Sequence, residues 1–261
     1  MDWVRDFYAK QYEWADWRRR WSDFDPDDPD PRVDAVTRHA GSEPLRILEL
    51  GSGTGTTAAA LAVAGHEVVA IEIQGDLAAY TQELAAVVTG GSLCAIAGDF
   101  YEAEPPGKFD VVAYFDGFGI GSDEDQRRLL RRIVGWLVPG GSVLVDVLTP
   151  WYWARRAGNE EEFPPGTGVR YLDGFDPGGC RMTERMWRVG HEDDAVTQSL
   201  RCYSPADLRL LLEGTGLSVV DVEPFTDEGY SQPCELADAM LYLATLAPKG
   251  GEVSSATRGG W

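Results

Sequence analysis

Short apolar runs alternate with segments of helical spacing along most of the chain. The apolar runs predict buried strands at residues 46–50, 66–73, 92–99, 109–116 and 142–148. Between them, helical spacing predicts helices at residues 55–65, 75–88 and 122–141. The last of these begins with Ser122 as an N-cap and carries acids in its first turn. Strands that alternate with helices predict an α/β fold with a parallel sheet covered on both faces.

The alternation stops after residue 149 and resumes at residue 204. The interrupting stretch holds a Trp/Tyr cluster, a Gly/Pro-rich part and two predicted hairpin strands at 180–189 and 195–203. A helix with Ser204 as N-cap then precedes two further strands, at 217–224 and 240–247. The pattern predicts four parts: an N-terminal helical lid segment at 1–40, a core at 41–149 and 204–247, an insertion at 150–203 and a disordered tail at 248–261.

The N-terminal segment is predicted to be helical over residues 2–21. Its aromatic side chains fall near one face of such a helix, at Trp3, Phe7, Trp14, Trp17 and Trp21. The stripe favours either packing against the rest of the protein or a lid over a pocket, and the two are compatible. The Asp/Pro-rich stretch that follows predicts a solvated loop.

Composition limits the partners. The 261 residues include 43 acidic and 23 basic side chains, a net charge of −20 that repels a phosphate backbone and argues against nucleic acid. The charge serves solubility or attracts cations. We expect no membrane span, because no apolar run reaches about 18 residues, and no secretory signal at the charged N-terminus. The four cysteines are scattered, so we expect no metal site and a cytoplasmic location.

A glycine-rich turn follows the first predicted strand in LELGSGTG. Gly51, Gly53 and Gly55 lack the Cβ atoms that would keep a ligand away from the backbone, and the next helix offers free N–H groups. Glu72 closes the second strand, where an acid can accept both hydroxyls of a ribose. Asp99 after the third strand can accept from an exocyclic amine. The pattern predicts a nucleotide-like ligand at one edge of the sheet.

The glycine spacing separates two classes of ligand. A dinucleotide fingerprint needs a glycine at the position that Thr56 occupies, so the match fails. Glu49 lies inside the apolar strand, where a carboxylate is costly without a partner. It can hold the N–H groups of the turn or reach a cationic amine or a sulfonium.

The ordered set of segments resembles class I S-adenosylmethionine-dependent methyltransferases of the small-molecule and natural-product type. The resemblance rests on LELGSGTG, AIEI, AGDF, FDVVAYFD, LVPGGSVLVDV and YSPADLRLLLEGTGLSVVDVEP, within residues 45–150 and 200–247. It implies a Rossmann-like sheet of seven strands in the order 3-2-1-4-5-7-6, with strand 7 antiparallel and an acceptor-specific insertion after strand 5.

The resemblance also implies roles around S-adenosylmethionine. The residues around its methionine part would be Glu49, Gly51, Ser52, Gly53 and Gly55. Glu72 would bind the ribose and Ile73 would pack on the adenine. Asp99 and Phe100 would meet the adenine edge and face. Phe115 and Asp116 would close the site from the fourth strand.

Methyl transfer from a sulfonium needs alignment and sometimes a base. Asp116 is our preferred base or orienting group, and the alternative is that it bonds nearby backbone or the cofactor. His191 can deprotonate a hydroxyl, or it is an exposed turn residue between the two hairpin strands. Tyr114 and Phe118 belong to the stretch that should lie over the methyl group.

Three aromatic residues follow the fifth strand: Trp151, Tyr152 and Trp153. They can form an aromatic wall or a cation–π cradle for the acceptor, or they anchor the insertion. The features together favour methyl transfer to an oxygen or nitrogen of a small molecule by a monomer or homodimer. A nicotinamide-dependent oxidoreductase and a non-methylating S-adenosylmethionine-binding protein are the alternatives.

Overall fold

A computed structural model describes residues 2–16 and 24–250 of the chain. Trp17 and Trp21 of the aromatic stripe lie outside these residues, as does the predicted tail from residue 251 onward. The first helix, α1, covers Asp2–Trp14 and so accounts for the first part of the predicted helix at 2–21.

The central sheet has seven strands. They are β1 (Arg46–Leu50), β2 (Glu67–Glu72), β3 (Ser92–Ala97), β4 (Phe109–Tyr114), β5 (Leu137–Leu148), β10 (Leu217–Phe225) and β11 (Leu241–Pro248). Their order is β10-β11-β5-β4-β1-β2-β3, and β11 runs antiparallel to both of its neighbours. Because β10 and β11 are the sixth and seventh strands of this sheet along the chain, the predicted order and the antiparallel last strand are confirmed.

Helices cover both faces of this sheet. Helices α6 (Asp123–Trp136) and α8 (Pro205–Leu211) share one apolar cluster with the strands, and α3 (Pro31–Ala40), α4 (Thr56–Val63) and α5 (Gly75–Leu84) share another. A capping box of Ser122 and Asp125 starts α6, so the predicted N-cap Ser122 is confirmed. Two 3₁₀ turns, Gly229–Ser231 and Leu236–Asp238, precede β11.

The insertion forms a second, smaller sheet. After α7 (Pro150–Arg156) come β6 (Glu160–Glu162), β7 (Val169–Asp176), β8 (Arg181–Arg188) and β9 (His191–Arg201), all antiparallel. The sequence predicted only the last two of these strands. The alternating VRYLDGFD segment of β7 did not stand out as a strand because glycines and prolines surround it.

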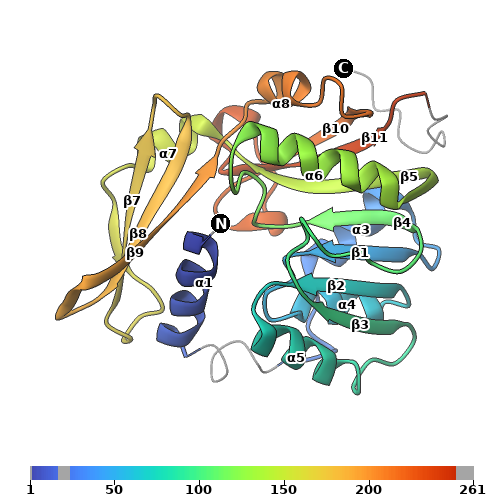
Figure 1. The fold of residues 1–261 in the computed structure, drawn as a ribbon, viewed down its shortest axis with the longest axis horizontal. Coiled ribbons are helices and arrows are strands. Elements are labelled where there is room, and N and C mark those ends of the chain that lie inside the picture. Colours follow the sequence, from blue (N-terminus) through green and yellow to red (C-terminus); the bar gives the residue numbers. More distant parts are fainter. Residues whose placement is uncertain (1, 17–23, 251–261) are drawn as a thin grey trace.

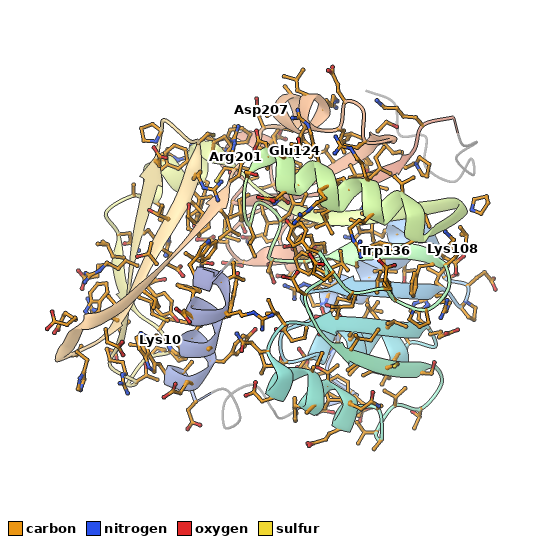
Figure 2. The ribbon with its side chains drawn as sticks, in the orientation of Figure 1. Lys10, Lys108, Glu124, Trp136, Arg201 and Asp207 are labelled. Carbon is orange, nitrogen blue, oxygen red and sulfur yellow. The ribbon has the colours of Figure 1, made fainter. Side chains whose placement is uncertain are left out.

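Helix α1 lies between the two sheets (Figure 1). Phe7 and Trp14 pack against Val169, Tyr171 and Met186 of the small sheet. The Lys10 ammonium pairs with Asp194 of β9, and Figure 2 labels Lys10 on the side of α1 that meets this strand. The aromatic stripe therefore packs α1 against the insertion. The opposite side of α1 faces the central sheet (Figure 1). None of the helices within the described residues is long and apolar enough to cross a membrane.

Candidate active site

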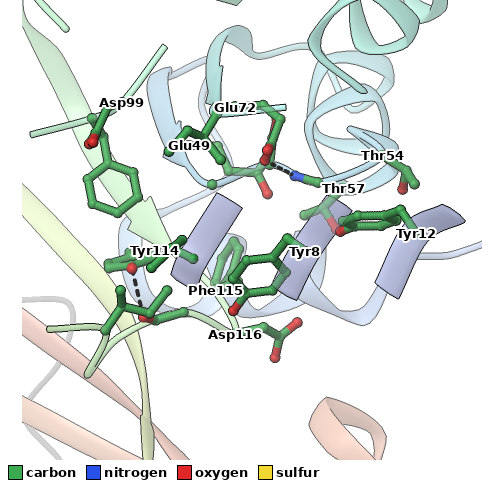
Figure 3. Close-up of a pocket in the computed structure, with 18 of the residues that line it drawn as sticks. Tyr8, Tyr12, Glu49, Thr54, Thr57, Glu72, Asp99, Tyr114, Phe115 and Asp116 are labelled. Carbon is green, nitrogen blue, oxygen red and sulfur yellow. Dashed lines mark hydrogen bonds between the residues drawn. The ribbon is translucent and has the colours of Figure 1, made fainter. Parts of the chain in front are cut away.

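A cavity of about 260 Å³ lies where the parallel strands β1 to β4 end (Figure 3). Helix α1 closes it from the other side. Its lining residues are Val4, Tyr8, Tyr12, Arg32, Glu49, Gly51, Ser52, Gly53, Thr54, Thr56, Thr57, Glu72, Ile73, Asp99, Phe100, Tyr101, Tyr114, Phe115, Asp116, Gly117 and Ile120. Ligands of open parallel sheets bind at this edge, so the cavity is the candidate active site.

The glycine turn is held open by hydrogen bonds to the second strand. Gly51 donates its N–H to the Ile71 carbonyl at 2.8 Å, and Gly53 donates to Glu72 Oε2 at 2.8 Å. Gly51 and Gly53 both have positive φ, at 69° and 56°, where a side chain is disfavoured. Burial raises the pKa of Glu72, and the N–H groups of Gln74 and Gly53 partly offset this by favouring the charged form.

Three buried polar atoms of the cavity have no hydrogen-bond partner among the described residues. They are Glu49 Oε2, Arg32 Nε and Ser52 Oγ. Glu49 is only 4% exposed, and burial raises its pKa to about 8, opposed by the nearby Arg32 charge. Unpaired buried polar groups cost free energy. The cavity therefore presents an acceptor for a cation and a donor for an anion side by side, which fits a zwitterionic amino acid such as the methionine part of S-adenosylmethionine.

Arg32 is a functional candidate that the sequence did not reveal. It belongs to the first turn of α3, which Asp30 caps and Pro31 begins. The guanidinium pairs with Asp116 and lies 5.6 Å and 5.5 Å from the ring centroids of Phe115 and Tyr230. The Asp–Pro start signal could have predicted the helix. The arginine's position depends on packing that the pattern does not contain.

Asp116 lies two residues after the end of β4 and has a left-handed backbone, with φ at 57°. Its N–H donates to Asp146 Oδ2 at 3.1 Å, and Asp146 also accepts from the Tyr230 hydroxyl. Burial raises the pKa of Asp146 to about 7, and the charge of Asp116 adds to this. The Asp116 side chain is 63% exposed, with Arg32 as its cationic partner. A non-glycine residue held in this conformation at a cavity is typical of functional sites.

The far end of the cavity is aromatic. Phe100 and Tyr114 stand edge to face, with ring centroids 5.2 Å apart. Asp99 Oδ1 accepts from the Tyr101 N–H at 2.9 Å, which leaves its other oxygen for a further donor. Ile73 joins these residues in the lining. Flat apolar faces next to a carboxylate oxygen suit a nucleobase with an exocyclic amine.

Tyr8 and Tyr12 cover the glycine turn from α1 (Figure 3). A Cβ built on Gly53 would lie 2.6 Å from the Tyr12 hydroxyl oxygen. Together with Val4, these tyrosines close the cavity from α1, whereas Phe7 and Trp14 of the predicted stripe pack on the insertion. Neither tyrosine was recognised from the sequence, because neither belongs to the tryptophan and phenylalanine stripe of α1.

Six of the candidate residues lie outside the lining of the cavity: Gly55, Phe118, Trp151, Tyr152, Trp153 and His191. Phe118 is buried in the cluster beneath α6. The three aromatic residues belong to α7. There Trp153 is buried in the cluster that joins the insertion to α1 and the Tyr152 hydroxyl donates to Asp227 at 3.0 Å. This placement favours the anchoring interpretation over an aromatic wall.

His191 starts β9 at the tip of the β8–β9 hairpin and is exposed. The structure therefore supports the turn interpretation for this residue, and we assign it no role in the site. Gly55 is the N-cap of α4, and its missing Cβ makes room for Thr81 of α5.

We expect Gly55→Ala to destabilise the protein without a direct effect on ligand contacts. The new Cβ would lie 2.2 Å from Thr81 Oγ1 at a φ of 74°, so both strain and overlap oppose it, by about 3 kcal/mol together. Gly214→Ala is the matched control, since Gly214 has the same φ and no atom within 4 Å. It should cost about 1 kcal/mol. Chemical denaturation of both variants measures the difference, and equal losses would contradict the packing role.

Comparison with known proteins agrees with this geometry. A family described as a methyltransferase domain matches residues 8–222. The cypemycin N-terminal methyltransferase of a Streptomyces species is 29% identical over 204 residues, covering 73% of this chain and 82% of the relative. The CcbJ methyltransferase of Streptomyces caelestis superposes with a TM-score of 0.72 at 22% identity, covering 92% of this chain and 97% of that one.

A third solved structure is an S-adenosylmethionine-dependent methyltransferase from Clostridium acetobutylicum ATCC 824, with a TM-score of 0.68 at 14% identity. The match covers 95% of this chain and 100% of the other. The fold and the cavity define a class I methyltransferase, as the resemblance of the sequence segments implied. Because the family's pattern matches most of the chain, the protein belongs to the methyltransferase-domain family. This assignment favours a methyltransferase over the oxidoreductase alternative.

Proposed function

We propose that the protein binds S-adenosylmethionine in this cavity and transfers its methyl group to a nitrogen or oxygen of a small molecule. The observation that carries the proposal is the group of unpaired buried atoms on Glu49, Arg32 and Ser52 beside an open glycine turn. An amino acid end would give the carboxylate an ammonium and the guanidinium a carboxylate. Such partners would satisfy the unpaired Glu49 Oε2 and Arg32 Nε.

The other lining residues can be assigned to the remaining parts of S-adenosylmethionine. Glu72 would bind the ribose, and Ile73, Asp99 and Phe100 would surround the adenine. The glycines at 51 and 53 would let the backbone approach the ligand. Phe115 and Tyr114 would border the methyl position. These roles carry the family's pattern to the residues that line the cavity, and they stand as proposals.

When bound, S-adenosylmethionine supplies a methyl group already activated on a sulfonium. The protein's own part is then to align the acceptor and to exclude water. Helix α1 would exclude water, with Tyr8 and Tyr12 over the turn. Because Arg32 engages its carboxylate, we assign Asp116 to orienting the acceptor rather than to removing a proton.

The cypemycin relative is named as a methyltransferase of an N-terminus, and this name supports a nitrogen acceptor. A cytoplasmic location and a monomeric or homodimeric state also remain proposals.

Titration calorimetry with S-adenosylhomocysteine and with NADH tests the cofactor. We expect one site with a dissociation constant near the micromolar range, about −8 kcal/mol, for the first and no binding for the second. Binding of NADH instead would overturn the proposal. Tight binding of S-adenosylhomocysteine without any transfer from labelled S-adenosylmethionine to amine or hydroxyl acceptors would favour the non-methylating alternative.

A further inference from the structure

A row of polar side chains crosses the inner face of the insertion sheet. Asp173, Glu184 and Gln198 stand opposite one another on β7, β8 and β9. The neighbouring rows on this face are apolar and pack against α1: Tyr171, Met186 and Val196 on one side, and Phe175, Met182 and Leu200 on the other. Polar groups inside an apolar interface need hydrogen-bond partners. The partners of this row therefore indicate its role.

Hydrogen bonds connect this row to the cavity, from Glu184 through Gln198 to Tyr8. Gln198 Nε2 donates to Glu184 Oε1 at 2.9 Å, which turns the amide oxygen toward α1. That oxygen lies 3.4 Å from the Tyr8 hydroxyl. A carbonyl oxygen can only accept, so Tyr8 must donate its proton to Gln198. The Tyr8 oxygen therefore has only its lone pairs to offer to the cavity that it lines.

The charges around Tyr8 are mostly negative. Arg156 forms an ion pair with Asp173, with 2.6 Å between Nε and Oδ2, and Arg32 pairs with Asp116. Glu184 has no ion-pair partner within the part of the chain that the structure describes. Burial raises its pKa to about 7, and the nearby Asp173 and Glu161 charges add to this, while the Gln198 hydrogen bond and the Arg156 charge oppose the shift.

Burial also raises the pKa of Tyr8, and the negative charges of Glu184, Asp116 and Glu72 raise it further. The Tyr8 hydroxyl therefore stays neutral in a negative potential. Such a position favours cations and N–H donors and disfavours anions. Tyr8 and Asp116 face the same part of the cavity (Figure 3).

From this arrangement we infer that the methyl acceptor is a basic amine whose N–H donates to the Tyr8 oxygen, with Gln198 and Glu184 as positioning residues. The inference rests on the proposed function, because it names the acceptor of the same site. In the reaction, the bound ammonium would first lose one proton to water, and the neutral nitrogen would then form the bond to the methyl carbon while the carbon–sulfur bond breaks. The electron pair of that bond would stay on sulfur, and the positive charge would pass from the sulfonium to the N-methylated ammonium product.

Three probes of similar shape and different charge test the inference: phenethylamine, phenethyl alcohol and 3-phenylpropionate. Calorimetry first measures S-adenosylhomocysteine binding alone, and then each probe against the saturated protein. We expect phenethylamine to bind at least about 10-fold more tightly than the other two, because one neighbouring charge contributes about this much. Failure of S-adenosylhomocysteine to bind would overturn the proposed function. Normal binding of S-adenosylhomocysteine with equal probe affinities, or with no binding of phenethylamine, would overturn the inference of an amine acceptor and leave the proposed function standing.

Variants locate the preference in the polar row. Glu184→Gln should reduce the preference for phenethylamine by about 10-fold, and Tyr8→Phe should weaken phenethylamine more than phenethyl alcohol. Asp193→Asn is the control, because Asp193 is an exposed acid on the same strand as Gln198 and its loss removes the same charge. An unchanged preference in Glu184→Gln, or an equal fall in Asp193→Asn, would refute the role of Glu184.

Discussion

Gly53→Val is expected to abolish measurable binding of S-adenosylhomocysteine, a loss of at least about 100-fold in affinity, or about 2.7 kcal/mol. A Cβ at this position would lie 2.6 Å from the Tyr12 hydroxyl oxygen, and valine is poorly tolerated at a φ of 56°. The distortion would also disturb the bond from the Gly53 N–H to Glu72. Calorimetry on the folded variant measures the effect.

The control for this variant is Gly65→Val at the other end of α4. Gly65 also has a positive φ, at 102°, and a Cβ added there would have no atom within 4 Å. This variant should lose stability through backbone strain and keep its affinity for S-adenosylhomocysteine. Circular dichroism confirms that both variants fold. Normal affinity in folded Gly53→Val would show that the glycine turn does not hold the ligand.

Glu49→Gln should weaken S-adenosylhomocysteine binding by about 100-fold, because it removes the carboxylate that would pair with the ligand's ammonium group. The same change should stabilise the free protein by about 2 kcal/mol at pH 8, since the unpaired carboxylate is costly there. Glu83→Gln, on the exposed side of α5, is the control and should change neither property. A loss of both affinity and stability in Glu49→Gln would mean that the carboxylate is structural.

The pH dependence of stability follows from the pKa of Glu49. Its folded value of about 8 lies above the ordinary 4.5, so the folded protein holds this proton where the unfolded chain has lost it. The stability of the free protein should therefore fall as the pH rises from about 5 to 8, and fall less in Glu49→Gln. An ammonium beside Glu49 favours its charged form. Affinity for S-adenosylhomocysteine should thus rise about 10-fold from pH 6 to pH 8 in the natural chain only. Thermal unfolding and calorimetry across this range measure both effects, and a flat affinity in the natural chain would contradict the assignment.

The residues at strand ends were accessible from the sequence because each one ends an apolar strand or follows it within two residues. Gly51, Glu72, Asp99 and Asp116 all line the cavity for this reason. Parallel strands bring their carboxyl ends to one edge, so identifying the strands places these side chains together. The strand order required more than alternation and came from the resemblance of the ordered segments.

The contributions of α1 and α3 could not be predicted in the same way. Tyr8 and Arg32 reach the cavity only because α1 packs on the insertion sheet and α3 on the central sheet. Such contacts join residues far apart in the chain, and no local pattern encodes them. Trp153 shows the converse, since its position after β5 suggested the cavity while packing turned its ring into the cluster beside α1.

A crystal structure with S-adenosylhomocysteine tests the central claim most directly. We predict that its amino nitrogen lies within hydrogen-bond distance of Glu49 Oε2 and its carboxylate within reach of Arg32, with the ribose hydroxyls on Glu72. A complex in which neither Glu49 nor Arg32 contacts the ligand, or in which the ligand binds away from the carboxyl ends of β1 to β4, would contradict the account.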